Sequence, residues 1–265
     1  MGGALHARCR VFHVSLEAVT TEVLEKMNAS LAASSMPDGL RALIVSDDVE
    51  PVWLNELGGL TIRDGDRYIK WNPLSSGIDL RKEVDRLAWA APFTVVPRVI
   101  EFGSNADAQW MITHALPGES AVSARWRHVP LLCAREIGRG LRILHDALPV
   151  AACPFTWSIE DRTNGRHTAA SLHAPPDDLL AVCHGDACSP NTLLAHDGSF
   201  LGHVDMGSLG VADRWADLAV ASMALDWNYE PAFEDEFFAA YGIAPDAERI
   251  AFYRDLWNRE DELQK

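Results

Sequence analysis

The chain has 265 residues, of which 48% are hydrophobic and 23% charged, a composition typical of a globular protein and not of a disordered one. Its formal net charge is −15. Because an acidic surface repels phosphate backbones and attracts cations, we expect no nucleic-acid partner, and small cationic molecules are favoured. The length allows one large domain or two small ones around a shared cleft.

The cysteines and the N-terminal residues bear on the cellular compartment. The five cysteines, Cys9, Cys133, Cys153, Cys183 and Cys188, form an odd number without a CxxC pair, which indicates neither a disulfide framework nor a zinc ribbon. The N-terminus lacks the long apolar core of a signal peptide, and no window reaches the roughly 18 apolar residues of a membrane span. We therefore expect a cytoplasmic protein with no membrane partner.

The first half of the chain predicts a small antiparallel sheet. Residues 16–31 carry apolar side chains at helical spacing and predict a helix that precedes it. The predicted strands cover residues 42–45, 51–57, 96–103 and 108–116. Residues 58–71 predict a hairpin that turns at Asp64-Gly65. Asp79 can cap one helix within this region, whose apolar face is Leu80, Val84, Leu87 and Ala88.

From residue 128 onward the pattern is mainly helical. Apolar stripes predict one helix at 131–146 and another after Pro245-Asp246. Two short strands, 192–195 and 200–205, are predicted between them as a hairpin. With a boundary near Pro117-Gly118, the chain divides into a β-rich N-terminal lobe (1–116) and a helical C-terminal lobe (117–265), an α+β class.

The segment CHGDACSPN (183–191) concentrates polar and thiol side chains between two apolar runs. Three chemistries are open for it. A zinc site would use Cys183, His184 and Cys188, although it lacks a fourth ligand and paired spacings. A Cys-His nucleophile pair is also conceivable, although such pairs are normally assembled from separate segments. The third is phosphoryl transfer, in which His184 supports the loop and Cys188 is a small buried side chain.

Phosphoryl transfer makes use of the spacing. One carboxylate must accept or orient the proton of the acceptor hydroxyl, and nearby oxygen ligands must hold Mg²⁺ against the nucleotide phosphates. Asp186 and Asn191, five residues later, supply both from one loop. Asp205, followed by Met206-Gly207, lies at the end of the next predicted hairpin and supplies a second metal ligand. This order is that of a kinase catalytic loop and its metal loop.

The upstream lobe contains the other parts that a kinase needs. A lysine on a strand must hold the α- and β-phosphates, and a helical glutamate must fix that lysine. Lys70 lies in a predicted strand, and Glu83 lies on the helix capped by Asp79. The turn at Leu57-Gly58-Gly59 comes one hairpin before the lysine, where its backbone amides would cover the phosphates.

HGDACSPN followed by GHVDMGSLGVADRWADLA resembles the aminoglycoside phosphotransferase family, and most closely its 3'-phosphotransferase group. Residues 144–155 and 241–257 resemble that group as well, so the resemblance covers about residues 50–257. It implies a protein-kinase-like bilobal fold that binds ATP or GTP with Mg²⁺.

The resemblance also implies residue roles. Asp186 would be the catalytic base, Asn191 and Asp205 the magnesium ligands, and Lys70 with Glu83 the phosphate-binding ion pair. The hinge that would hold the base consists of His114, Ala115 and Leu116, and loop support would come from Asp213 and Asp217.

The acceptor side departs from the family. Thr156-Trp157 follows CPF, and the helix after ADLA has Met223 and Ala224 where charged residues are expected. Trp157, Trp227 and Trp257 are interpreted as packing residues. The main hypothesis is an ATP- or GTP-dependent kinase of an aminoglycoside hydroxyl. The alternatives are a kinase of an endogenous amino sugar, amino alcohol or other metabolite, and a non-catalytic nucleotide-binding protein of the same fold.

Overall fold

The computed structural model describes residues 36–55 and 57–263, which form two compact units. The first unit contains the residues up to Ala88 together with Pro97–Leu116, and the second contains Trp89–Val96 together with the residues from Pro117 onward. The helix predicted at 16–31 lies outside the described residues. Over the described ranges, the structure contains no helix long and apolar enough to cross a bilayer.

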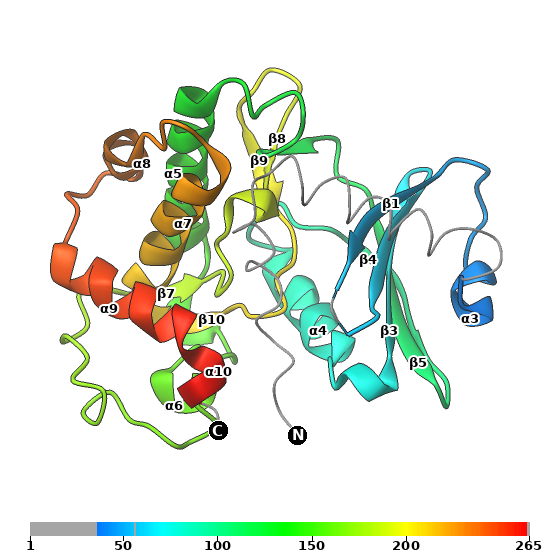
Figure 1. Ribbon diagram of the computed structural model, residues 1–265, viewed down its shortest axis with the longest axis horizontal. Helices are drawn as coiled ribbons and strands as arrows, with labels where there is room; N and C mark the ends of the chain where they lie inside the picture. The colour runs from blue at the N-terminus through cyan, green and yellow to red at the C-terminus, as the bar shows by residue number, and fades with distance from the viewer. Residues whose placement is uncertain (1–35, 56, 264–265) are drawn as a thin grey trace. The chain divides into compact units, whose positions relative to one another are not determined.

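The first unit is built on a five-stranded antiparallel sheet with the order β1-β2-β3-β5-β4 (Figure 1). Its strands are β1 (Val49–Leu54), β2 (Leu60–Asp64), β3 (Arg67–Pro73), β4 (Val99–Ser104) and β5 (Ala108–His114). The hairpin predicted around Asp64-Gly65 is confirmed, with Asp64 paired to Arg67 across a two-residue turn. Its helical segments are α3 (Asp38–Arg41), the 3-10 turn η2 (Leu74–Ser76) and α4 (Leu80–Ala90).

The strand predicted at residues 42–45 is wrong, because this segment is a turn and coil between α3 and β1. The backbone amides of Val45 and Ser46 donate to the side chain of Asp64, at 3.2 and 2.8 Å, and not to a neighbouring strand. These two amides therefore bond to a carboxylate and not to the carbonyls of a paired strand. The apolar run that predicted the strand packs Leu43 and Ile44 against the sheet from this coil.

Side-chain alternation along β3 decides where Lys70 lies. Ile69 and Trp71 belong to the buried core cluster on one face of the sheet, so Lys70, between them, lies on the opposite face. The other buried members of that cluster are Leu40, Leu60, Ile62, Ala108 and Ile112. Helix α4 begins after Asp79, whose carboxylate accepts the Arg81 amide at 3.0 Å as the capping prediction requires.

The second unit is mainly helical. Its helices are α5 (Pro130–Ala147), α6 (Ile159–Arg162), α7 (Trp215–Asn228), α8 (Glu234–Tyr241), α9 (Ala247–Asn258) and α10 (Glu260–Leu263), with 3-10 turns η3 (Val150–Ala152) and η4 (Ser189–Asn191). Helix α7 is buried from Trp215 to Leu225 and packs against α5, α8 and α9 (Figure 1). A helix that is apolar on all sides requires such a central position.

Two small antiparallel sheets in the second unit carry the loops that matter for function. Their strands are β6 (Glu119–Ser120), β7 (Leu180–Cys183), β8 (Thr192–Leu194), β9 (Phe200–His203) and β10 (Gly210–Asp213). The strand orders are β6-β8-β9 and β10-β7. The predicted hairpin is confirmed as β8 and β9, although β9 ends at His203. Asp205 therefore lies just beyond the ladder.

Candidate active site

The first unit brings together Lys70 on β3 and Glu83 on α4. The Lys70 Nζ lies 2.6 Å from Glu83 Oε1 and 2.8 Å from Oε2. The glutamate side chain is only 4% exposed, whereas that of the lysine is 21% exposed. An ion pair of this kind fixes the ammonium while leaving it within reach of a ligand. The predicted pair is present, and its role toward a nucleotide stays a prediction.

The glycine turn is closed on itself by Asn55. The amides of Leu57 and Gly59 donate to Asn55 Oδ1, at 3.0 and 2.7 Å, and the Gly58 amide donates to the Asn55 carbonyl. Gly58 has a φ of +81°, and a Cβ on Gly59 would lie 1.7 Å from Asn72 Oδ1. The turn itself therefore explains both glycines. The predicted contact with phosphates requires these amides to change partner.

At the predicted hinge, two of the three backbone amides already have acceptors. The His114 amide donates to the carbonyl of Arg98 at 3.0 Å, and the Ala115 amide donates to the carbonyl of Asp66 at 2.8 Å. A purine bound at this hinge would thus use other groups, such as carbonyl oxygens or the Leu116 amide. The hinge role of His114, Ala115 and Leu116 stays a prediction.

In the second unit, the loop that follows β7 holds Asp186. This residue is buried, with 4% of its surface exposed. Its carbonyl accepts a hydrogen bond from Asn191 Nδ2 at 2.9 Å, so the two residues predicted from their spacing are in direct contact. With its NH₂ turned toward Asp186, the amide of Asn191 presents Oδ1 away from that bond, and oxygen is the atom that Mg²⁺ prefers.

Backbone pairing of β8 with β9 places Asn191 beside the start of the loop that carries Asp205. Thr192 pairs with His203, and the Val204 amide donates to the carbonyl of Asn191 at 3.0 Å. Asn191 and Asp205 thus flank the same end of the hairpin, one on each side. Asp205 adopts the left-handed conformation with a φ of +61°. Non-glycine residues in this region concentrate at functional sites.

His184 connects these two loops. Its Nδ1 accepts the Asp186 amide at 3.2 Å, so the ring proton belongs on Nε2, which donates to the carbonyl of Val204 at 2.9 Å. The imidazole therefore joins the residue predicted as base to the residue before Asp205. Because both ring nitrogens are engaged in this way, His184 is neither a metal ligand nor a general base, in keeping with its predicted role as loop support.

Asp217, on α7, binds the backbone of the same loop. Its Oδ2 accepts the His184 amide at 2.6 Å, and its Oδ1 accepts the Gly185 amide at 2.9 Å. Oδ2 also accepts from His145 Nε2 at 3.0 Å, and His145 Nδ1 lies 2.9 Å from the hydroxyl of Tyr241. Burial favours the neutral acid, but the bonds from His145 and the amides outweigh it and lower the pKa of Asp217.

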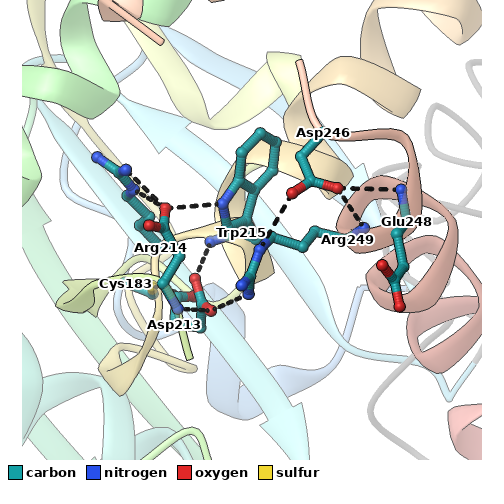
Figure 2. A network of polar contacts seen from close by, with 8 residues as sticks. Cys183, Asp213, Arg214, Trp215, Asp246, Glu248 and Arg249 are labelled. Carbon is teal, nitrogen blue, oxygen red and sulfur yellow. Dashed lines mark hydrogen bonds and ion pairs between the residues drawn. The ribbon is translucent and has the colours of Figure 1, made fainter. Parts of the chain in front are cut away.

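Asp213 has a separate supporting network, which Figure 2 shows. Its Oδ1 accepts the Trp215 amide at 3.0 Å, and its Oδ2 accepts the Asp178 amide at 2.8 Å and Arg249 Nη1 at 3.0 Å. Asp246, which caps α9, also pairs with Arg249. Burial nonetheless raises the pKa of the Asp213 carboxyl. These contacts join β10, α7 and α9, and they do not include Asp186.

The zinc and cysteine readings of the segment find no support. The Cys183 thiol is buried and donates to the carbonyl of Asp213, and burial raises its pKa well above the ordinary value. His145, Cys183 and Asp217 bring potential metal-binding atoms within 4.8 Å of one another. The protonated thiol is a poor ligand, and the carboxylate already accepts three hydrogen bonds. Hydrogen bonding, not metal binding, accounts for this cluster.

Sequence reasoning missed His145 and Tyr241, which lie 72 and 24 residues from Asp217 along the chain. Both lie in segments that resemble the family, 144–155 and 241–257, but the resemblance gives neither residue a chemical role. The available signal was weak: both are polar residues at the ends of apolar helices, and a buried tyrosine hydroxyl normally has a hydrogen-bond partner. Only the packing of α5, α7 and α8 brings them together.

The fold and these side chains define a protein-kinase-like phosphotransferase, which moves a phosphoryl group from a nucleotide co-substrate to a hydroxyl. Residues 166–253 match the model of the "Phosphotransferase enzyme family". The chain is 33% identical over 218 residues to an aminoglycoside 3'-phosphotransferase of Streptomyces fradiae, covering 69% of this chain and 81% of that relative. It is 32% identical over 252 residues to streptomycin 3''-kinase of Streptomyces griseus, covering 80% and 92%. This chain belongs to the aminoglycoside phosphotransferase family.

A solved structure supports the same assignment. Aminoglycoside phosphotransferase APH(3'')-Id from Streptomyces rimosus, in complex with ADP and streptomycin, matches with a TM-score of 0.62 and 28% identity over 85% of this chain and 96% of that chain. The predicted family, the α+β kinase-like fold and the enzyme class are therefore confirmed.

Proposed function

We infer that the protein transfers the γ-phosphoryl group of ATP to a hydroxyl of an aminoglycoside, with Asp186 as the base that orients that hydroxyl. One observation carries the inference. Asp186 is joined by hydrogen bonds to Asn191 and, through His184, to Val204 beside Asp205. This arrangement gathers the base and two oxygen ligands at one end of the β8–β9 hairpin, as phosphoryl transfer to a hydroxyl requires.

Each side chain then has a defined task. The Asp186 carboxylate accepts the proton of the acceptor hydroxyl as the oxygen attacks phosphorus. Asn191 Oδ1 and the Asp205 carboxylate fit Mg²⁺, a hard cation that binds oxygen, and the bound ion would neutralise phosphate charge. Lys70, fixed by Glu83, orients the α- and β-phosphates. ATP is proposed over GTP because the Streptomyces rimosus relative binds ADP. An enzyme that consumes ATP is expected in the cytoplasm.

The acceptor is proposed from the relatives and from charge. Aminoglycosides are polycations, and the chain carries a net charge of −15, which attracts them. The match to streptomycin 3''-kinase extends over 252 residues, against 218 for the Streptomyces fradiae 3'-phosphotransferase. Streptomycin is therefore the first acceptor to test, and a 3'-hydroxyl acceptor such as kanamycin is the second.

The test is acceptor-dependent release of ADP by wild type, Asp186→Asn and Asp197→Asn. Asp197 is an exposed aspartate of the β8–β9 turn in the same unit, so it is the matched control. Asp186→Asn should lower kcat by about 10²–10⁴, the usual contribution of a positioned base, while ATP still binds with unchanged affinity. Asp197→Asn should match wild type.

Four acceptors separate the alternatives in that assay. Turnover with streptomycin or kanamycin supports the proposal. Turnover with choline or glucosamine alone would favour a metabolite kinase. Binding of ATP without turnover on any acceptor would favour the non-catalytic alternative, and undiminished transfer by Asp186→Asn would contradict the role of that residue.

A further inference from the structure

The segment that follows η3 is attached to β10. The Val211 amide donates to the carbonyl of Phe155 at 3.0 Å, and the Trp157 amide donates to the carbonyl of Val211, also at 3.0 Å. Thr156 forms a parallel bridge with Val211 between these bonds. The backbone of residues 155–157 is thus fixed on both sides of that bridge. This is the segment in which the sequence departs from the family pattern after CPF.

The side chain of Trp157 reaches the loop that carries Asp186. Its indole is 2% exposed, and its Nε1 donates to the carbonyl of Gly185 at 3.1 Å. Gly185 has a φ of +78°, and a Cβ there would lie 2.5 Å from Trp157 Cδ1 and 2.2 Å from the Ser208 carbonyl oxygen. The indole therefore packs directly on the residue before Asp186, where another side chain would not fit.

This bond acts on one particular peptide group. The Gly185 carbonyl and the Asp186 amide belong to the same planar unit. Trp157 holds the oxygen end of that unit, and His184 Nδ1 accepts from its N–H end at 3.2 Å. With both ends fixed, the plane cannot rotate, and the direction in which Asp186 leaves the backbone is set.

The indole itself packs against Arg162, which also packs against Trp257. The guanidinium carbon of Arg162, on α6, lies 4.7 Å from the centroid of the Trp157 ring and 5.8 Å from that of Trp257, on α9. Arg162 is 8% exposed and Trp257 is also 8% exposed. Cation–π contacts of a desolvated guanidinium are among the stronger ones. The contact with Arg162 therefore limits movement of the Trp157 indole, which in turn limits movement of the Gly185–Asp186 peptide.

We propose that Trp157 is a positioning residue of the phosphotransfer reaction, whose indole N–H sets the orientation of the Gly185–Asp186 peptide. The proposal rests on the proposed function, because it assigns Trp157 an effect through Asp186. It differs from a packing role in what it predicts. Loss of packing lowers stability, whereas loss of the N–H lowers kcat in a protein that stays folded.

The experiment compares Trp157→Phe, Trp157→His and Trp257→Phe with wild type. Phenylalanine keeps an aromatic ring but has no donor, and histidine restores an N–H. Trp257→Phe is the matched control, since Trp257 stacks on the same Arg162. For each, kcat with streptomycin or kanamycin, the ATP dissociation constant and the melting temperature are measured.

Trp157→Phe should lower kcat about tenfold, the effect of one hydrogen bond near the reacting group, with ATP affinity within about twofold of wild type. Trp157→His should recover part of the lost kcat. Trp257→Phe should lower the melting temperature with little change in kcat. In an Asp186→Asn background, Trp157→Phe should have no further effect, because its action passes through Asp186.

An unchanged kcat in Trp157→Phe, or an equal loss in Trp257→Phe, would overturn the proposal. So would failure of both Trp157 variants to fold, because a structural role would then explain the residue. If wild type shows no turnover at all, the proposed function fails first and the positioning role falls with it. Turnover in wild type that Trp157→Phe leaves unchanged refutes the positioning role alone.

Discussion

Lys70 and Asp186 are held in place in opposite ways. In the first unit, a direct ion pair with Glu83 holds the ammonium group of Lys70. In the second unit, the backbone of the loop at Asp186 is fixed by side chains from η4, the loop after β7, α7 and the segment after η3, namely Asn191, His184, Asp217 and Trp157. The ion pair positions the charge of Lys70, and the hydrogen bonds of the loop position the peptide groups next to Asp186.

This difference would suit the tasks proposed for the two residues. A lysine that binds flexible phosphates must keep its positive charge, whereas one exact side-chain geometry matters less. A base must lie within hydrogen-bond distance of one hydroxyl, and an error of about 1 Å is enough to slow a reaction by about 10²-fold. Substitutions in the two regions should therefore lower turnover for different reasons. In the first unit they should act by disturbing the charge of one ion pair, and in the second by changing the geometry of the loop.

Apart from substitution of Asp186 itself, the largest effect is expected from Lys70→Met. Removing the ammonium should lower kcat by about 10²–10³, the usual effect of deleting one donor to developing charge. Glu83→Gln should lower it by less, since the lysine keeps its charge but loses its carboxylate partner. If the glutamate acts only through Lys70, the double variant should equal Lys70→Met. Steady-state kinetics on the four proteins of this cycle measure the coupling.

Lys82→Met is the control for that cycle. Lys82 is adjacent to Glu83 on α4 and is exposed, so its removal changes the net charge equally without touching the pair. Its kinetics should match wild type. Additive effects of Lys70→Met and Glu83→Gln would show that the glutamate has a second role and would break the contrast between the two regions.

Asp217→Asn should give the next largest effect. The buried carboxylate accepts from the His184 and Gly185 amides and from His145. An asparagine would direct an NH₂ group toward at least one of these donors. We expect kcat to fall by about 10²-fold as the loop shifts, and the free energy of unfolding to fall by about 3 kcal/mol. ATP affinity should change little.

Tyr241→Phe provides a graded comparison for Asp217→Asn. It removes the hydroxyl that contacts His145 Nδ1 but leaves the aromatic ring and Asp217 in place. Burial raises the pKa of Tyr241 to about 12, so the hydroxyl is a donor at any working pH. The loss in kcat should be only a few-fold. A larger loss than that of Asp217→Asn would show that support for the loop does not run through the aspartate.

The parts of the site that the sequence predicts are those whose spacing is fixed by local chemistry. Asp186 and Asn191 share one short loop, and Asp205 follows one hairpin later, so the order of residues predicts their proximity. Lys70 and Glu83 are 13 residues apart on successive elements. The same local logic explains the confirmed hairpins and the Asp79 cap.

The parts that it does not predict depend on distant packing or on competing side chains. Trp157 was interpreted as a packing residue, because nothing in its neighbourhood indicates a bond to Gly185, 28 residues away. Asn55 closes the glycine turn, a contact that the two glycines do not indicate. Residues 42–45 have strand-like composition, but the Leu43 and Ile44 amides donate to carbonyls of α3, and the Val45 amide donates to the Asp64 carboxylate. Strand propensity does not take into account one strong side-chain acceptor elsewhere in the chain.

The smallest effect on turnover is expected from a substitution in the Asp213 network, whose contacts described above do not include Asp186. Arg249 donates to Asp213 Oδ2 and pairs with Asp246, in the network that joins β10 to α9 (Figure 2). Arg249→Met should leave kcat within about twofold of wild type, since no hydrogen bond of the loop is lost. Stability should fall by about 1–3 kcal/mol, because a buried carboxylate loses its cationic partner.

That loss of stability should depend on pH. Burial already raises the pKa of Asp213 in the folded protein, and removal of Arg249 should raise it further. A carboxyl with a raised folded pKa favours the folded state while it is protonated and loses that advantage as pH rises through the folded pKa. Urea unfolding of Arg249→Met and wild type should therefore differ most near neutral pH and converge as pH falls toward 4. A difference that grows on acidification would contradict this account, because protonation of a carboxylate weakens its ion pair with Arg249.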